Sequence, residues 1–223
     1  TPPNPDLEMF FGGLLEIKGG IEVGVSLVSA TGIDLKKKDI NGTATAPIVD
    51  NPASGYVPNS GVNIAPISMP GLDFTRLFNE AVKTGDYHDM NGGELIINAS
   101  TAISGPVIYV DGDVRVQGDI NASIVATGDI TILSGSVTGS TEYGIAAATT
   151  NGNITDNSTG DHWGLFYSKT GNFSQGASAG EIVGQIIVGG IVEKTGGKAL
   201  IFEFTVPEEI FIIANPEIAA WQK

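Results

Sequence analysis

The fold of this chain is decided by residues 106–132, which read PVIYVDGDVRVQGDINASIVATGDITI. Short apolar pieces alternate, residue by residue, with other side chains, and each piece ends at Gly or at Gly followed by Asp. This alternation is typical of strands in a sheet with one buried face. The predicted inward set is Ile108, Val110, Val114, Val116, Ile130 and Ile132, and the predicted outward set is Tyr109, Asp111, Arg115 and Thr131.

The same corner recurs along the chain, where Gly is followed by Asp or Asn and then by an apolar residue. It occurs at Gly112, Gly118, Gly128, Gly152 and Gly171, with a degenerate copy at Gly190. Successive glycines from Gly152 to Gly190 are spaced by 19 residues, and 24 residues separate Gly128 from Gly152. Three short strands joined by corners need roughly 18 to 24 residues, so stacked coils with parallel strands are expected.

The spacing therefore predicts an all-β fold, a parallel β-helix (solenoid) over residues 86–223. Gly tolerates the backbone conformation of the corner, Asp or Asn binds the local backbone there, and the next residue enters the core. The alternative is a Gly-rich β-sandwich built from hairpins, and the two equal intervals weigh against it.

One amphipathic capping helix is predicted near residues 73–84. Its apolar residues share one helical face: Phe74, Leu77, Phe78, Ala81 and Val82. Asp73 suits the N-cap, Leu72 and Leu77 are placed for a hydrophobic staple, and Gly85 suits the left-handed residue after the last turn. Because an open solenoid end exposes strand edges, this helix and the C-terminal tail are expected to cap the two ends.

We expect one domain in three parts. Residues 1–70 form an extended, loop-rich β region that packs on the solenoid, residues 71–85 the helix, and residues 86–223 the β-helix with its C-terminal cap. Eight of the eleven prolines lie in the first seventy residues. Within that region, residues 14–28 are the best strand material, and residues 41–69 are predicted to be a long turn-rich connection.

Composition excludes several classes of function. The 223 residues include 11 Lys and Arg against 25 Asp and Glu, a formal charge of −14, and no Cys. Nucleic acids and anionic lipids are poor partners for such a chain, and thiol chemistry is ruled out. No apolar stretch is long enough to cross a bilayer, so no membrane insertion is expected.

Three stretches, residues 72–84, 105–114 and 124–130, resemble the C-terminal β-helix region of PilX-like type IV pilus-associated proteins of Gram-positive bacteria. The ending Ala220-Trp221-Gln222 is similar to the Trp-containing terminus of those proteins. The resemblance covers about residues 70–223 and implies an extracellular, cell-surface module that is structural or adhesive, with pilus components as partners. The related tapirins bind cellulose, which implies an insoluble polysaccharide as a ligand. Family members carry an N-terminal apolar pilin-like helix, which this sequence lacks.

Catalysis is not predicted, although many parallel β-helices are polysaccharide lyases or hydrolases. Such enzymes need clustered carboxylates with a basic residue, or paired Asp or Glu. Between Thr84 and Ser168 ten acidic residues accompany a single cation, Arg115. Asp113, Asp119 and Asp129 are expected to be turn residues.

The two histidines do not change this view. His88 is expected in a solvated loop, and no nucleophile motif surrounds His162. We predict no catalytic residue, no metal and no cofactor.

Binding to a polysaccharide surface is the function predicted instead. A β-helix offers flat, rigid faces, and aromatic rings on such a face stack on sugar rings. The candidates are Tyr109, Tyr143, Trp163 and Tyr167. The alternatives are a polymer-forming scaffold of bactofilin type and a polysaccharide lyase or hydrolase.

Overall fold

The computed structural model describes residues 8–11, 14–16, 26–29, 32–36, 44–50, 52, 54, 57–62, 70–195, 200–202 and 211–212. The chain divides into two compact units, Thr1–Ser68 with Ile191–Glu193, and Met69–Gly190 with Lys194–Lys223. The packing of residues 1–70 on the solenoid stays a prediction. The predicted C-terminal cap lies outside the described residues, except for one short strand.

The N-terminal unit consists of two stacks of short parallel strands. The first stack contains β1 (Glu8–Phe11), β3 (Ser26–Ser29), β5 (Ala44–Ala46) and β7 (Asn59–Ser60), and the second contains β2 (Leu14–Glu16), β4 (Gly32–Asp34) and β6 (Val49–Asp50). Residues 41–69 therefore include three short strands, which the prediction of a turn-rich connection there did not identify. The reason is strand length: strands of two or three residues are too short to show an alternating pattern between Pro-containing corners.

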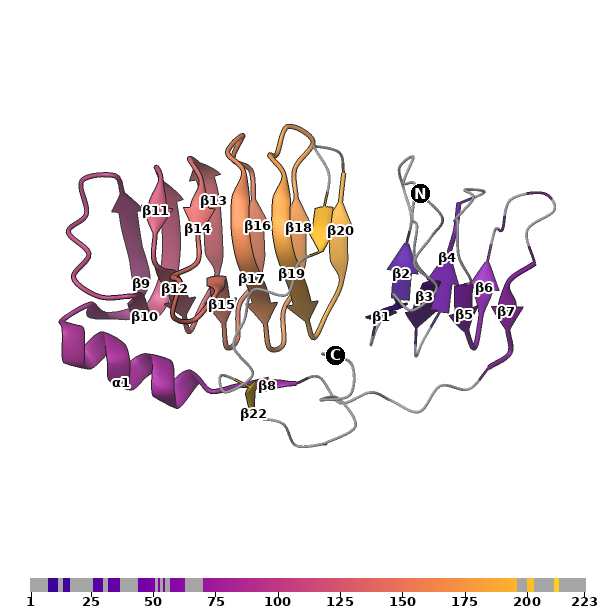
Figure 1. Cartoon of the computed structure of the whole chain (residues 1–223), viewed down its shortest axis with the longest axis horizontal. Helices are drawn as coiled ribbons and strands as arrows, with labels where there is room; N and C mark the ends of the chain where they lie inside the picture. Colours follow the sequence, from indigo (N-terminus) through magenta and orange to yellow (C-terminus); the bar gives the residue numbers. More distant parts are fainter. Residues whose placement is uncertain are drawn as a thin grey trace. The chain divides into compact units, whose positions relative to one another are not determined.

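The second unit contains the solenoid, and the predicted parallel β-helix is confirmed. Its elements are β8 (Gly71–Leu72), α1 (Phe74–Thr84), β9 (Tyr87–Asn98), β10 (Val107–Gln117), β11 (Ile120–Asn121), β12 (Ser123–Ala126), β13 (Ile130–Ser134), β14 (Val137–Thr138), β15 (Ile145–Thr149), β16 (Ile154–Asp156), β17 (His162–Ser168), β18 (Phe173–Gln175), β19 (Ile182–Val188), β21 (Leu200–Phe202) and β22 (Phe211–Ile212). One more strand, β20 (Val192–Lys194), lies mostly in the segment grouped with the first unit. Among described strands only β8 and β22 pair antiparallel. Figure 1 shows the coils from β9 to β19 stacked in sequence order.

Three parallel ladders run along the stack, one on each side of the coil. The first joins the start of β10 to β12, β15 and the second half of β17, and the second joins the end of β10 to β13, β16 and β18. The third joins β11 to β14, the start of β17, the start of β19 and β21. All six residues of the predicted inward set are buried between these ladders.

Corner glycines let one coil lie directly on the next. A Cβ on Gly152 would overlap the carbonyl group of Gly128, and a Cβ on Gly171 would overlap that of Gly152. A second row of the same kind runs through Gly135, Gly160 and Gly180. The predicted corner positions are therefore the places where two backbones touch, so no larger residue fits there.

The acidic and amide residues after these glycines bind the next coil, as predicted for turn residues. The backbone N–H of Asp129 donates to Asp113 Oδ1 at 2.8 Å, and that of Asn153 donates to Asp129 Oδ1 at 2.7 Å. The N–H of Asn172 donates to Asn153 Oδ1 at 2.9 Å. These bonds span 16, 24 and 19 residues, which are the lengths of successive coils.

The predicted helix is confirmed as α1. Asp73 caps it by accepting a hydrogen bond from the Arg76 N–H at 3.0 Å, and Gly85 ends it in the left-handed conformation with its N–H on the Ala81 carbonyl. Leu77 and Ala81 are buried, whereas Val82 is exposed and lies off the buried face.

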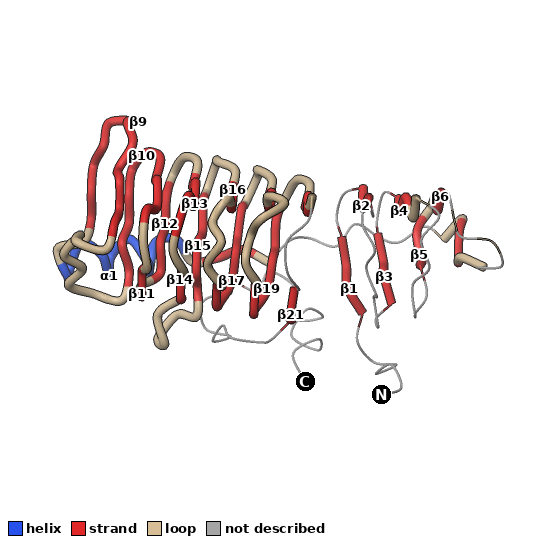
Figure 2. The backbone as a smooth tube through the Cα atoms, turned by 90° about the horizontal axis from the view of Figure 1, so that it is seen from above, coloured by secondary structure: helices blue, strands red, loops and turns tan. Residues whose placement is uncertain are grey.

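The helix covers a side of the solenoid rather than its end. Its buried face packs against residues of β10, β12, β15 and β17, including Tyr109, Val125, Ala148 and Tyr167. Figure 1 shows α1 running along the stack, and Figure 2 shows the same arrangement from above. A helix of eleven residues is about 16 Å long, which matches the roughly 14 Å across four stacked strands. The expected end cap is thus a lateral cover.

Replacing a stacked corner glycine tests the coil-on-coil contact. Gly152→Ala should lower the free energy of unfolding by about 3 kcal/mol, because the added methyl forces two coils apart. Asn151→Ala, next to it and exposed, should change stability by less than about 0.5 kcal/mol. Urea unfolding followed by circular dichroism measures both, and equal stability of the two variants would contradict this account of the corner.

Candidate functional site

The structure separates the four predicted sugar-binding aromatics. Trp163 is 42% exposed, whereas Tyr109, Tyr143 and Tyr167 are 8%, 2% and 1% exposed. The three tyrosine rings therefore have no face available for stacking on a sugar. Of the four aromatics, only Trp163 is exposed on the surface, as sugar binding requires.

Helix α1 and the segment before it bury two of the tyrosines. Tyr109 does point out of the coil, as the alternation predicts, but the Phe78 ring covers it edge-on, with the ring centroids 5.4 Å apart. Phe74 packs in the same way on Tyr167 at 5.8 Å, and the Tyr167 hydroxyl donates to the Pro70 carbonyl at 2.9 Å. Burial raises the pKa of the hydroxyls of both tyrosines. A side chain that points out of the coil is exposed to solvent only where no other element packs on that side of the sheet.

Tyr143 lies under the polar side of α1. The Arg76 guanidinium sits over its ring, 5.6 Å from the centroid. A groove of about 500 Å³ opens beside it and is lined by Asp73, Thr75, Arg76, Asn79, Glu80, Lys83, Glu142 and Tyr143. Lys83 and Glu80 form an ion pair at 3.2 Å across this surface. The groove therefore carries charges of both signs and favours no single ligand charge.

Trp163 stands on the third ladder, among side chains that alternate outward. We call this surface the Trp163 face and define it by two rows, Asn121, Thr138, Trp163 and Val183 in one, and Asp119, Ser136, Asp161 and Glu181 in the other. In the first row Thr138 and Val183 flank Trp163 in register on the neighbouring strands. Both flanking side chains are short, so the indole projects from a low, flat surface.

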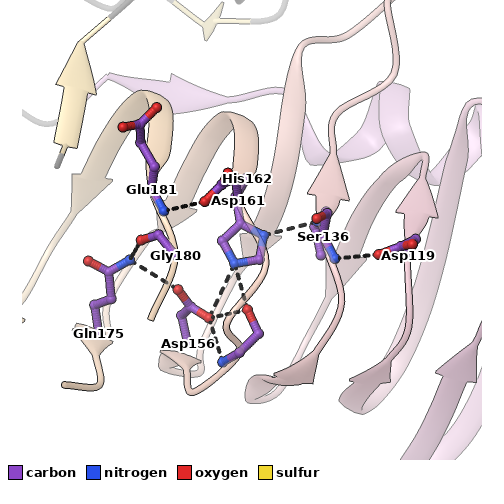
Figure 3. Close-up of polar contacts among 10 residues, drawn as sticks. Asp119, Ser136, Asp156, Asp161, His162, Gln175, Gly180 and Glu181 are labelled. Atoms are coloured by element: carbon purple, nitrogen blue, oxygen red, sulfur yellow. Dashed lines mark hydrogen bonds and ion pairs between the residues drawn. The ribbon is translucent and has the colours of Figure 1, made fainter. Parts of the chain in front are cut away.

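The second row is acidic and joined to the backbone. Asp119 Oδ1 accepts a hydrogen bond from the Ser136 N–H at 2.8 Å, and Asp161 Oδ1 accepts one from the Glu181 N–H at 2.9 Å. Figure 3 shows Asp119, Ser136, Asp161 and Glu181 in a row along successive coils. Asp119 is thus a turn residue, as predicted, and these bonds fix the spacing of the coils under Trp163.

A fully buried polar cluster lies directly beneath this face. It consists of Asp156, Ser158, His162 and Gln175, each no more than 1% exposed. Asp156 Oδ1 accepts hydrogen bonds from the Ser158 N–H at 3.0 Å and the Ser158 hydroxyl at 2.9 Å, and lies 3.2 Å from His162 Nε2. Gln175 Nε2 donates to Asp156 Oδ2 at 3.1 Å and to the Gly180 carbonyl at 3.0 Å. Figure 3 shows Asp156, His162 and Gln175 reaching toward one another from neighbouring coils.

The cluster contains Ser, His and Asp but is not arranged as a nucleophile triad. In a triad the acid binds Nδ1 and the serine binds Nε2. Here Nδ1 accepts a hydrogen bond from the Val137 N–H at 2.9 Å, and both Ser158 Oγ and Asp156 Oδ1 face Nε2. The serine also donates to the aspartate, so its oxygen is held away from any reacting group. The cluster ties coils together.

Sequence reasoning missed this cluster, although one signal was present. Trp163 points outward on β17, and Asp161 points outward just before this strand begins, so alternation turns His162 inward. The same alternation turns Asp156 inward, because it lies two residues after the buried Ile154 on β16. Its partner Gln175 follows only from the register with the next coil. His88, by contrast, lies on β9 and is partly buried, so the solvated loop predicted for it was wrong.

Asp156 is held in its charged form. Burial by itself raises the pKa of this carboxyl, but the interactions with His162, Ser158 and Gln175 outweigh burial and bring the pKa below its usual value. A buried carboxylate that is fully hydrogen-bonded stabilises the folded state while it stays ionised.

The described residues contain no group of three or more His, Asp or Glu arranged to hold a metal ion. Within the same ranges, no helix is both long enough and apolar enough to span a bilayer. Comparisons with protein-family models, with curated proteins and with solved structures found no match to this chain.

Asp156→Asn tests the cluster. At pH 7 the variant should lose about 3 kcal/mol of unfolding free energy, because an amide cannot accept all the hydrogen bonds that the carboxylate accepts. The folded-state pKa is lowered, so the wild-type advantage is complete above about pH 5 and shrinks as pH falls toward 3. Guanidinium unfolding at several pH values measures the difference.

Asp111→Asn is the matched control. This exposed carboxylate accepts a hydrogen bond from Thr127 Oγ1 at 2.8 Å, so its variant should lose less than about 0.5 kcal/mol. A wild-type advantage over Asp156→Asn that grows as pH falls from 5 to 3, where the carboxyl itself takes up a proton, would contradict the assigned role of Asp156.

Proposed function

We propose that this chain is a non-enzymatic, extracellular surface module that binds an insoluble polysaccharide such as cellulose through the Trp163 face. The observation that carries the proposal is the exposed indole of Trp163, flanked in register by Thr138 and Val183 on a flat parallel sheet. An indole exposed on a rigid surface offers a large apolar area with a polar edge, which suits stacking on a sugar ring.

Association with type IV pili is the second part of the proposal. It is supported by the resemblance of residues 70–223 to PilX-like proteins. The net charge of −14 also fits a partner that is neither nucleic acid nor an anionic membrane. The acidic row of the Trp163 face disfavours polyanionic glycans, so a neutral polysaccharide is the ligand that this surface favours.

An enzymatic role has little support among the residues described. The buried Ser158 and His162 are turned toward each other and toward Asp156 inside the coil. Arg115, which could act as a base, is 2.9 Å from Glu94 in an ion pair on another side of the solenoid. We therefore propose binding without turnover.

Depletion from solution by microcrystalline cellulose tests the proposed binding. Trp163→Ala should weaken the binding about tenfold, because a stacked aromatic contributes roughly 1.4 kcal/mol. Trp163→Phe should keep part of the affinity, since it retains a smaller ring. Leu133→Ala removes a side chain of similar exposure, 40%, from another side of the solenoid and should bind like the wild type.

Two outcomes would reject the proposal. One is no depletion of the wild-type protein at micromolar concentration across cellulose, mannan and chitin. The other is equal binding by Trp163→Ala and the wild type, when circular dichroism shows that both proteins are folded.

The alternative function, a polymer-forming scaffold, requires an end strand with a free edge with which a second copy of the chain can pair. In the described part of the chain, β9 pairs with β10 alone. Its register breaks between Asp89 and Glu94, where Asn91 and Gly92 have positive φ. The N–H of Asn98 is bound by Thr101 Oγ1 at 2.9 Å. Such interruptions protect an edge strand from pairing with another chain.

Sedimentation checks this point. The protein should stay monomeric as its concentration is raised, because the free edge of β9 is interrupted between Asp89 and Glu94 and again at Asn98. Filaments or a mass that grows steadily with concentration would favour the scaffold over the binding module.

A further inference from the structure

The buried His162 lies one residue from Trp163, on the opposite side of the same strand. Its Nδ1 accepts a hydrogen bond from the Val137 N–H at 2.9 Å. A neutral imidazole has one protonated nitrogen and one acceptor nitrogen, so accepting at Nδ1 places the proton on Nε2. Nε2 in turn faces Ser158 Oγ at 2.9 Å and Asp156 Oδ1 at 3.2 Å. This geometry fits the neutral ring with its proton on Nε2.

Protonation of this ring creates a conflict at one contact. The imidazolium carries a proton on Nδ1 as well, and that proton faces the Val137 N–H. Two donors cannot share a hydrogen bond, and both groups are buried, so the contact must open. Breaking it frees the N–H of a residue that belongs to β14.

Strand β14 is also the neighbour of Trp163. Thr138 is in register with Trp163, and the Gly139 N–H donates to the Trp163 carbonyl at 2.8 Å. Val137 and Thr138 are the whole of this strand. The contact with His162 therefore anchors the short strand that forms one flank of the Trp163 face.

The groups around the ring favour opposite protonation states. From β16, the Asp156 carboxylate stabilises the imidazolium, while from β14 the Val137 N–H stabilises the neutral ring. The Phe166 ring on the same strand packs edge-on at 5.9 Å, Ile182 of β19 lies in register, and Gln175 of β18 contacts Asp156 but is uncharged. The carboxylates of Asp161 and Glu181 stand in the outward row of the Trp163 face.

We propose that His162 is an acid-sensitive lock on the Trp163 face: protonation of its ring breaks the bond to Val137 and loosens β14 beside Trp163. The neutral ring holds the strand, and the protonated ring releases it. The lowered pKa of Asp156 keeps that carboxylate charged throughout this change, so the event belongs to the histidine. Loosening of β14 needs only the fold; its effect on polysaccharide binding rests on the proposed function.

Amide hydrogen exchange on the wild-type protein tests the lock without any ligand. Between pH 8 and pH 5, NMR follows the His162 ring shifts and the protection factor of the Val137 amide, corrected for intrinsic exchange. We expect the protection factor of the Val137 amide to fall at least tenfold. The pH midpoint of this fall should coincide with the midpoint of the His162 ring titration. The Ile154 amide, which donates to the Asn172 carbonyl at 2.8 Å on another side of the coil, should keep its protection.

Two results on the wild type would overturn the proposal. One is a titrating His162 with unchanged Val137 protection, and the other is a ring that stays neutral down to pH 5. Because both are read on the unmodified protein, no variant has to fold for the test to decide.

Two variants then test whether the pH dependence of the Val137 protection comes from His162. His162→Asn keeps an acceptor near Val137 but does not titrate, so its Val137 protection should not depend on pH. His88→Asn removes the other histidine and should respond like the wild type. If cellulose binding fails at every pH, the proposed function fails alone, and the exchange data still decide the lock.

Discussion

The structure depends on one constraint, the direct contact between backbones of successive coils at the corners. Gly128, Gly152 and Gly171 lie on one another so closely that a Cβ on either of the last two would overlap the backbone of the preceding coil. The residue after each glycine then bonds to the next coil, from Asp113 through to Asn172. Contact and hydrogen bond together fix the spacing of the stack, and the three parallel ladders follow from that spacing.

The corners also account for several acidic residues of the solenoid. Asp113, Asp119 and Asp129 each accept a backbone N–H from the following coil. A carboxylate in this position satisfies a donor that a sharp corner leaves without a strand partner. Acidic residues in a regular row therefore serve the backbone, and a row of them on a solenoid is not by itself a sign of catalysis or of a metal site.

Burial and exposure are distributed unequally around the coil. The first ladder is covered by α1, so its outward tyrosines belong to a second apolar core. The third ladder leaves Trp163 exposed, and the interior beneath it includes a buried polar cluster among apolar side chains. The exposed indole and the buried His162 are neighbours on one strand, which places a titratable group within reach of the surface that we propose as the binding site.

The sequence by itself determined the solenoid, the inward residues, and the helix with its caps, because each depends on local alternation, corner glycines or helical periodicity. Which outward residues are exposed could be seen only in the tertiary structure. Tyr109 and Tyr167 are buried under α1, and no local sequence pattern shows on which side of the solenoid this helix packs. The partners of His162 were likewise beyond the sequence, because Val137 and Asp156 reach it through the register of neighbouring coils, and register is set by the whole stack.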